Sequence, residues 1–335
     1  MSSRNILEIR GLHTSFFTDS GVVRAADGVD LSVPRGKIVG LVGESGCGKS
    51  ITAKSVMGLV RYPGRIVSGS ILLDGKELVG LPEEELRKLC GEEVSMIFQE
   101  PMTSLNPVIR VGKQVEEALR VHGGRLPRGE AKKQVIRIFE KVGIPEAGER
   151  YHSYPHELSG GLRQRVMIAM AMIMQPKLLI ADEPTTALDV TVEAQILRLM
   201  RELCEETGMS VLIITHNMGV VAEICDEVYV MYAGRIVERA SVYGLFDETA
   251  HPYTKGLLLS IPRLRDNPEY LHTIPGVVPN LKHLPPGCAF HSRCGMASDR
   301  CREEMPELLP CGEGHACRCF RVGSDSPNYP AGEGV

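Results

Sequence analysis

The chain has 335 residues, enough for one large domain or two modest ones with a full hydrophobic core. Its formal net charge is −4 and its pI is about 6.2, which argues against a nucleic-acid-binding protein. The mean hydropathy is −0.04 and no apolar run approaches the roughly 20 residues of a membrane-spanning helix, so we do not expect an integral membrane protein.

The N-terminal third of the chain has the pattern of strands that lead to a glycine-rich loop. Residues 1–5 contain no apolar secretory segment, so we expect a cytoplasmic protein. Residues 6–9 and 29–33 predict strands, and the apolar, β-branched run 37–42 is typical of a buried strand. Asp74-Gly75 predicts a hairpin turn.

A phosphate-binding loop is predicted directly after the buried strand. The pattern G-x-x-x-x-G-K-[ST] is matched by Gly43, Glu44, Ser45, Gly46, Cys47, Gly48, Lys49 and Ser50. Its glycines let backbone N–H groups face phosphate oxygens at the positive end of the next helix. We expect Lys49 to reach the β- and γ-phosphates of ATP and Ser50 to coordinate Mg²⁺; a plain glycine turn is the alternative.

The middle of the chain predicts a helical insertion followed by a parallel sheet. From about 102 to 175 the pattern is helical, as in Val135, Ile138, Phe139 and Val142, with Gly143 just past the helix end. Residues 177–181 and 211–215 predict strands, and the helix between them can stop at Gly208. Strand, helix, strand at these lengths predicts an α/β fold with covered sheet faces.

Two carboxylates end the apolar strand at residues 178–181. Asp182 can hold the Mg²⁺ shell, and Glu183 can orient or deprotonate an attacking water. Taken alone, the pair could equally be a polar strand end that faces solvent.

Taken together, these motifs resemble the ATP-binding cassette (ABC) family over roughly residues 6–245. The resemblance implies a P-loop NTPase-type nucleotide-binding domain with a mostly parallel sheet core, an antiparallel β subdomain and a helical subdomain. It also implies roles for four further motifs: Gln99 as the glutamine that links Mg²⁺ to the helical subdomain, 186–189 as the D-loop, His216 as the switch histidine at the γ-phosphate, and Phe16, with Phe17 as fallback, as the aromatic residue on adenine.

The run Leu158–Arg165 resembles the family's signature sequence, with Leu162 where glutamine is usual. Ser159, Gly160 and Gly161 still offer donors at a helix N-terminus. In the family this run serves the nucleotide of a second cassette, so the resemblance implies a partner ATPase subunit: a homologous one, with a homodimer possible in isolation.

Six of the ten cysteines crowd into residues 288–319. Their spacing does not fit a paired C-x-x-C zinc site. Thiolates in fours hold zinc or an iron–sulfur cluster, and free thiols are the third possibility. Spacing alone leaves these alternatives open.

Residues 251–255, 274–276 and 287–294 resemble the C-terminal extension of dipeptide and oligopeptide importer ATPases. The resemblance implies a [4Fe–4S] cluster, or Zn²⁺, on Cys288, Cys294, Cys301 and Cys319, with Cys311 and Cys317 competing for the fourth place. Beyond about residue 245 the composition changes to a proline-punctuated stretch with little periodicity, so we expect a cassette at 1–245 and a small irregular extension at 246–322, which the resemblance makes the metal-binding part. Residues 323–335 are rich in Gly, Ser, Pro and Asn and predict a disordered tail.

The resemblance implies an ATPase that drives peptide import from the cytoplasmic face of the membrane. Its partners would be two permease subunits and, indirectly, an extracytoplasmic peptide-binding protein. The alternatives are an importer of another small solute, such as nickel, and a soluble ATPase with a redox-sensing cluster. Because the extension is far from the nucleotide motifs in sequence, we expect it to be structural or sensory.

Overall fold

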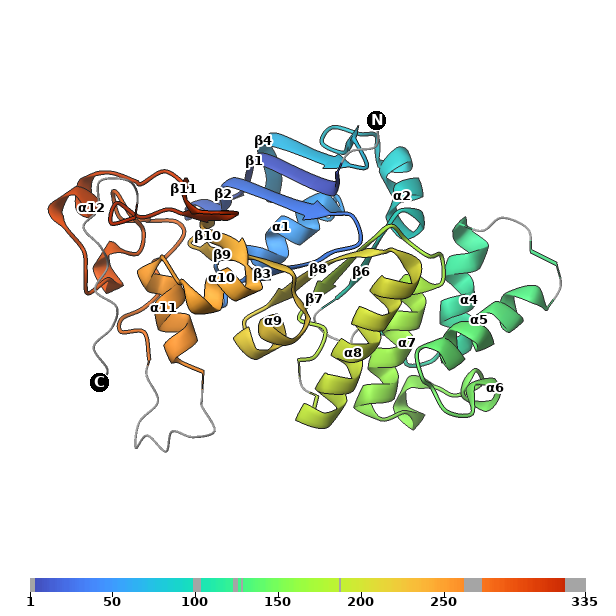
Figure 1. Ribbon diagram of the computed structural model, residues 1–335. Helices are drawn as coiled ribbons and strands as arrows, with labels where there is room; N and C mark the ends of the chain where they lie inside the picture. The colour runs from blue at the N-terminus through green and yellow to red at the C-terminus, as the bar shows by residue number, and fades with distance from the viewer. Residues whose placement is uncertain are drawn as a thin grey trace.

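The computed structural model describes residues 4–98, 104–122, 126–127, 129–186, 188–261 and 273–322. Gln99 and the tail at 323–335 lie outside these ranges. Two sheets, a group of helices at one end and a C-terminal extension at the other make up the described chain (Figure 1).

The first sheet is antiparallel, with the strand order β2-β1-β4-β5. Its strands are β1 (Asn5–Thr18), β2 (Gly21–Pro34), β4 (Gly64–Leu73) and β5 (Lys76–Glu77). The strands expected at 6–9 and 29–33 are therefore parts of longer strands. Asp74 and Gly75 have φ values of 49° and 81°, which confirms the predicted hairpin turn between β4 and β5.

The second sheet has the order β11-β12-β10-β9-β3-β8-β7-β6. Its strands are β3 (Ile38–Val42), β6 (Val94–Ile97), β7 (Leu178–Asp182), β8 (Ser210–Thr215), β9 (Glu227–Tyr232), β10 (Arg235–Ser241), β11 (Leu309–Gly312) and β12 (His315–Cys317). The five strands from β9 to β6 are parallel, as the strand–helix–strand pattern predicts.

The parallel strands are buried on both faces. Val39 and Leu41 pack toward α1 (Lys49–Val56) and the antiparallel sheet, whereas Ile38 and Val42 pack into the core on the opposite face. That opposite core includes α8 (Val190–Thr207) and α9 (Met218–Ile224). The loops at the carboxyl ends of these strands therefore start from a sheet that is packed on both faces.

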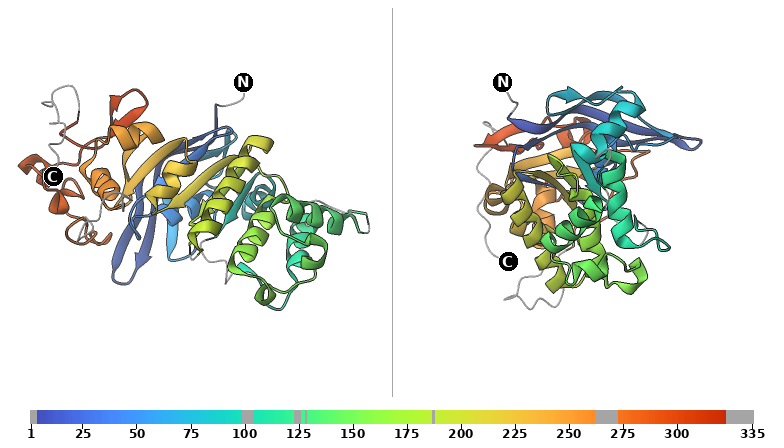
Figure 2. Two further views of the ribbon diagram at one scale, coloured as in Figure 1. Left: turned by 60° about the horizontal axis from the view of Figure 1, so that its bottom comes forward. Right: turned by 90° about the vertical axis from the view of Figure 1, so that its right-hand side faces the viewer.

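A helical group occupies the end of the molecule away from the extension (Figure 2, left). It contains α4 (Val111–His122), α5 (Glu130–Lys141), α6 (Ala147–Arg150) and α7 (Gly160–Met172), while α2 (Glu83–Glu92) precedes β6. Val135 and Phe139 are buried in α5, and Gly143 has a φ of 73° just past its end. The predicted helical insertion is confirmed in these elements.

The C-terminal extension is more closely joined to the sheet than its sequence suggests. After α10 (Val242–Asp247) come α11 (Pro252–Leu259), the short turn η2 (His291–Arg293) and α12 (Asp299–Glu303). The hairpin β11–β12 then pairs with β10, Glu238 lying opposite Cys317. The expectation of an irregular extension is thus incomplete, because strands of four and three residues leave no readable periodicity. The boundary near residue 245 stays a prediction.

Glu238 is a fully buried carboxylate that fastens the extension to β10. It accepts hydrogen bonds from the backbone N–H groups of Ala250, at 2.7 Å, and His251, at 3.1 Å. Its Oε1 atom also lies 2.8 Å from His315 Nε2 in β12. These partners supply the hydrogen bonds that a buried polar group requires.

Candidate functional site

The phosphate-binding loop connects β3 to α1, and its shape requires glycine at two positions. Gly43 and Gly48 have φ values of 150° and 113°. A Cβ atom at Gly43 would lie 2.2 Å from the carbonyl oxygen of Met231, and one at Gly48 would lie 2.0 Å from that of Ala25. A residue with a Cβ atom would clash with these carbonyl oxygens. The loop at the carboxyl end of β3 therefore passes in close contact with neighbouring backbone.

Lys49 and Ser50 open helix α1 at the end of this loop. Lys49 is buried, and its ammonium group donates to the carbonyl oxygens of Gly43, at 2.6 Å, and Glu44, at 3.1 Å. Ser50 Oγ donates to Asp182 Oδ1 at 3.0 Å, which joins the loop to the end of β7. Burial raises the pKa of Asp182, so a nearby cation would favour its ionised form.

Glu183 lies beside Asp182 in a strained, polar contact network. Its φ of 49° is uncommon for a residue other than glycine. Its two carboxylate oxygens lie 3.0 Å from His216 Nδ1 and 3.0 Å from Thr186 Oγ1. Burial raises the pKa of Glu183, but hydrogen bonds from His216 and Thr186 outweigh it and hold that pKa below its usual value. The carboxylate is therefore ionised at neutral pH.

Phe16 and the phosphate-binding loop share one cavity of about 280 Å³. Its lining residues come from the antiparallel sheet, the loop, the end of β7 and the extension: Phe16, Val23, Ala25, Ser45, Gly46, Gly48, Lys49, Ser50, Ile51, Glu183 and Leu281. Phe17, the fallback, instead packs under Arg65 at 4.5 Å. The thiol of Cys47 is buried in the core and does not line this cavity.

The signature residues do not line the nucleotide cavity. Ser159 caps α7, where its Oγ atom accepts a hydrogen bond from the N–H of Leu162 at 3.3 Å. Ser159 and Gly160 are exposed, and a Cβ atom at Gly161 would lie 2.8 Å from Val192. The run is a separate, open helix N-terminus with the donor character that suits an anion.

The cysteines Cys288, Cys294, Cys301 and Cys319 line one small cavity of about 20 Å³. Neither Cys311 nor Cys317 lines it, and Cys317 sits in β12 instead. Burial, with smaller contributions from the neighbouring Cys301, Cys319 and Cys294, raises the pKa of Cys288 to about 11. Within the described ranges, no group of three or more His, Cys, Asp or Glu side chains is arranged to hold a metal ion.

Whether this cavity suits a metal centre depends on the ligand atoms that line it and on its size. Four thiols are the ligand set of both tetrahedral zinc and iron–sulfur clusters. The volume leaves room for about one water-sized atom, so a four-iron cluster would need the thiols to stand further apart. The four thiols have the chemistry of metal ligands, but the described residues do not hold them in a metal-binding arrangement.

Two residues of the extension contact Glu44 of the phosphate-binding loop, which the sequence did not predict. Arg293 donates from Nη1 and Nη2 to the Glu44 carboxylate at 2.7 and 3.0 Å. Tyr253 OH accepts the backbone N–H of Glu44 at 2.8 Å. No local pattern pairs residues this far apart in the chain, although Arg293 belongs to the run that carries the resemblance of the extension.

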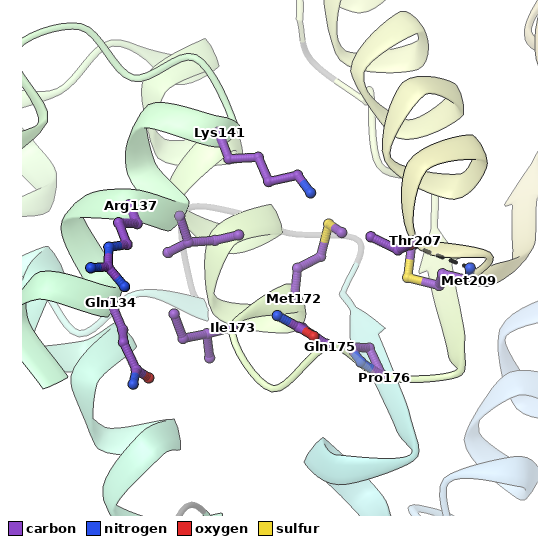
Figure 3. Close-up of a pocket in the computed structure, with 10 residues that line it drawn as sticks. Gln134, Arg137, Lys141, Met172, Ile173, Gln175, Pro176, Thr207 and Met209 are labelled. Atoms are coloured by element: carbon purple, nitrogen blue, oxygen red, sulfur yellow. Dashed lines mark hydrogen bonds between the residues drawn. The ribbon is translucent and has the colours of Figure 1, made fainter. Parts of the chain in front are cut away.

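A third cavity, of about 380 Å³, is lined by none of the nucleotide motifs (Figure 3). Its walls come from α5, the end of α7, the turn before β7 and the end of α8, and include Arg137, Lys141, Met172, Gln175 and Thr207. Lys141 also pairs with Glu206 at 2.6 Å. No predicted site residue lines this cavity.

No helix among the described residues has the length and apolar character to cross a membrane. Residues 26–186 match the family described as ABC transporter, and residues 237–301 match the C-terminal region of oligopeptide/dipeptide transporters. These matches cover the phosphate-binding loop, the signature run, the Asp182–Glu183 pair and the start of the extension, whereas Phe16 and His216 lie outside them.

Relatives match nearly the whole chain. A putative peptide import ATP-binding protein of Brucella ovis is 52% identical, covering 96% of this chain and 98% of its own length. The oligopeptide transport ATP-binding protein AppD of Bacillus subtilis is 50% identical, with 94% and 96% covered. The oligopeptide transport ATP-binding protein OppD of Salmonella typhimurium is 49% identical, with 94% and 93% covered.

Solved structures match the cassette part. The dimeric ABC cassette MJ0796 bound to ADP and phosphate has a TM-score of 0.64 and 25% identity, covering 70% of this chain and 98% of its own. The cassette cbiO1 of Clostridium perfringens has a TM-score of 0.63 and 30% identity, covering 73% and 92%. The chain therefore belongs to the ABC transporter family, as an ATP-binding cassette with ATPase activity whose C-terminal extension is that of oligopeptide/dipeptide transporters.

Proposed function

We propose that this chain lies at the cytoplasmic face of a membrane transporter, where its ATP hydrolysis drives the import of dipeptides or oligopeptides. The observation that carries the proposal is the match to peptide-import ATP-binding proteins through the extension as well as the cassette. An importer of another small solute, such as nickel, remains the alternative that uptake measurements must separate.

Each site residue has a chemical task in this proposal. The backbone N–H groups at 45–50 and the Lys49 ammonium bind the β- and γ-phosphates, and Phe16 packs on adenine. Ser50 and Asp182, already joined at 3.0 Å, would hold Mg²⁺, which offsets phosphate charge when bound. Gln99, outside the described residues, is assigned to the same ion and to the link with the helical subdomain.

Glu183 is the residue to which we assign activation of the attacking water. Its ionised carboxylate can accept a hydrogen bond or a proton from water as the oxygen attacks the γ-phosphorus, and ADP leaves. His216 Nδ1 lies 3.0 Å from one carboxylate oxygen of Glu183 and its side chain is exposed, and we assign it to the γ-phosphate. ATP and water thus yield ADP and phosphate.

Two cassettes complete each ATP site in this proposal. Ser159, Gly160 and Gly161 lie outside the cavity of their own chain and are open to a partner. The partner is a homologous ATPase subunit, with a homodimer available to the isolated chain. Two permease subunits receive the motion of the helical group, and a peptide-binding protein delivers solute outside.

The test compares Glu183→Gln with the exposed control Glu304→Gln. We expect Glu183→Gln to lower ATP turnover at least ~100-fold while ATP binding persists, because only the proton acceptor is lost. In cells, it should abolish uptake of labelled dipeptide and leave nickel uptake unchanged. Unchanged turnover would remove the assigned role, and loss of nickel uptake alone would favour the alternative solute.

We further propose that Cys288, Cys294, Cys301 and Cys319 bind a [4Fe–4S] cluster, with zinc as the alternative. Their shared cavity supports this set over one containing Cys311 or Cys317. When purified without oxygen, the wild-type protein and Cys311→Ser should each contain about four irons per chain and absorb broadly in the blue. Cys319→Ser should show neither the iron nor the absorbance. Stoichiometric zinc without iron would reject the cluster.

A further inference from the structure

The ion pair between Arg293 and Glu44 joins two parts of the molecule that otherwise have separate tasks. Glu44 is the second residue of the phosphate-binding loop, and Arg293 lies 249 positions later in η2. Both guanidinium Nη atoms reach the carboxylate, at 2.7 and 3.0 Å. Such a two-point contact fixes the direction of both side chains.

The Arg293 side chain is held on every side. It is 3% exposed, whereas that of Glu44 is 29% exposed. Its Nε atom donates to the carbonyl oxygen of Pro275 at 2.9 Å, and Nη1 lies 3.4 Å from Tyr232 OH. A buried arginine with this many contacts is fixed in one conformation, unlike a charged side chain on the surface.

Arg293 lies in the turn beside the cysteine cavity, and its neighbours Phe290, His291 and Cys294 line that cavity. Arg293 directly precedes Cys294, and its N–H donates to the carbonyl oxygen of Phe290 at 3.0 Å. The N–H of His291 in turn donates to the carbonyl oxygen of Cys288 at 2.9 Å. The one short turn that carries Arg293 thus runs between two of the four cysteines, Cys288 and Cys294.

The phosphate-binding loop receives a second contact from the extension. Tyr253 OH accepts the N–H of Glu44, and the Tyr253 ring packs 5.4 Å from that of Phe290, which is also in the wall of the cysteine cavity. The extension reaches the nucleotide cavity at Leu281 as well. The first turn of the loop is therefore bounded by the extension at both its backbone and its side chain.

We propose that Arg293 is a positioning residue for ATP binding, which transmits the packing of the cysteine cavity to the phosphate-binding loop through Glu44. The proposal rests on the ATP site described above. A displaced η2 turn moves Arg293, releases Glu44, and lets the loop that carries Lys49 depart from the shape that binds phosphate. The extension is thereby a support of the nucleotide site.

The first experiment measures the dissociation constant of Mg-ATP by calorimetry on the full chain. We expect Arg293→Lys and Glu44→Gln each to weaken ATP binding about tenfold, because neither can form the two-point contact. The double variant should be no weaker than either single one, since both remove the same link. The exposed pair Arg300 and Glu304, 2.9 Å apart in the same extension, supplies the matched controls Arg300→Lys and Glu304→Gln, expected within twofold of wild type.

The second experiment asks whether the cysteine cavity acts through this link. Cys294→Ser should weaken ATP binding in the wild-type background but add nothing in the Glu44→Gln background. Hydrogen exchange at residues 43–50 should speed up in Cys294→Ser and in Arg293→Lys without nucleotide, and stay slow in Arg300→Lys. This readout does not depend on ATP turnover.

The outcomes separate this proposal from the assignment of the ATP site itself. Lys49→Ala should weaken ATP binding at least ~100-fold; if it does not, the site assignment fails. If Lys49→Ala weakens binding while Arg293→Lys and Glu44→Gln do not, the positioning role fails. An equal effect of Cys294→Ser in both backgrounds would break the link between the cavity and the loop.

Discussion

Gln164 is a single residue of the signature run whose burial has a cost. It is fully buried in α7, and within the described part of the chain neither its Oε1 nor its Nε2 atom has a hydrogen-bond partner. Gln114 in α4 is also buried, yet it accepts from Asn106 N–H and donates to the carbonyl oxygens of Asn106 and Ile109. The two glutamines therefore allow a comparison between a buried amide that lacks hydrogen-bond partners and one that has them.

We predict that Gln164→Met raises the free energy of unfolding by about 1 kcal/mol, because it removes two buried polar atoms that lack partners. Gln114→Met should lower it by about 2 kcal/mol, since it strands the partners of a satisfied amide. Urea unfolding of both variants measures the difference. Equal destabilisation by the two substitutions would contradict this account.

For single residues, the sequence predicts which side chains gather at the nucleotide cavity, but not the ion pair between Arg293 and Glu44 that contacts the phosphate-binding loop. Lys49, Ser50, Asp182 and Glu183 follow from the loop pattern and from a strand that ends in carboxylates, both of which are local. The partner of Glu44 could not be predicted, because an ion pair across 249 positions leaves no local pattern.

Helix α4 carries a buried carboxylate that contacts its own helix and the chain that follows α6. Glu116 lies on its buried face and pairs with Lys113 at 2.7 Å and Arg120 at 2.6 Å. Tyr151, which follows α6, donates its hydroxyl to the same carboxylate. Burial raises the pKa of Glu116, but the hydrogen bonds from Lys113, Tyr151 and Arg120 outweigh it and lower that pKa to about 2.

We predict that Glu116→Gln lowers the free energy of unfolding by about 2 kcal/mol at pH 7. The pKa of Glu116 is lower in the folded state than its ordinary 4.5, so the carboxylate stabilises fully above pH 4.5 and loses this effect as pH falls toward 2. The gap between wild type and variant should therefore shrink across that window. Urea unfolding at pH 7, 4.5 and 3 measures it, and a constant gap would exclude the carboxylate as its source.

Among the elements, long periodic helices were predictable and short strands were not. Helix α8 shows buried Ile196, Leu199 and Leu203 on one face and ends at Gly208, as its pattern predicts. In β11 and β12, by contrast, pairing with β10 decides the structure, and seven residues that include Pro310 and Gly312 carry no alternation.

The whole molecule presents its two nucleotide-related surfaces separately. The cavity beside Phe16 and Lys49 belongs to one surface, and the open N-terminus of α7 at Ser159 belongs to another. This separation suits a pair of cassettes in which each supplies the part that the other lacks. The resemblance of Leu158–Arg165 to the signature sequence implied this separation, because in the family that run serves the nucleotide of a second cassette.

We predict that the Glu183→Gln chain forms a dimer with ATP but not with ADP, because in the proposed pairing the γ-phosphate would contact both surfaces. Adding Ser159→Arg should prevent that dimer while the monomer binds ATP as before, since Ser159 does not line its own cavity. Light scattering after size-exclusion chromatography measures both. A dimer that persists with Ser159→Arg would remove the signature run from the interface.

The pairing of β12 with β10 also sets an order of events during translation. Strand β10 has one neighbour in β9, and its other edge stays open until His315–Cys317 leave the ribosome. Until then the buried Glu238 carboxylate lacks His315 as well. A nascent chain that stops after α10 carries every nucleotide motif, yet it exposes a strand edge that favours aggregation, so the second sheet becomes complete only when the extension has been synthesised through β12.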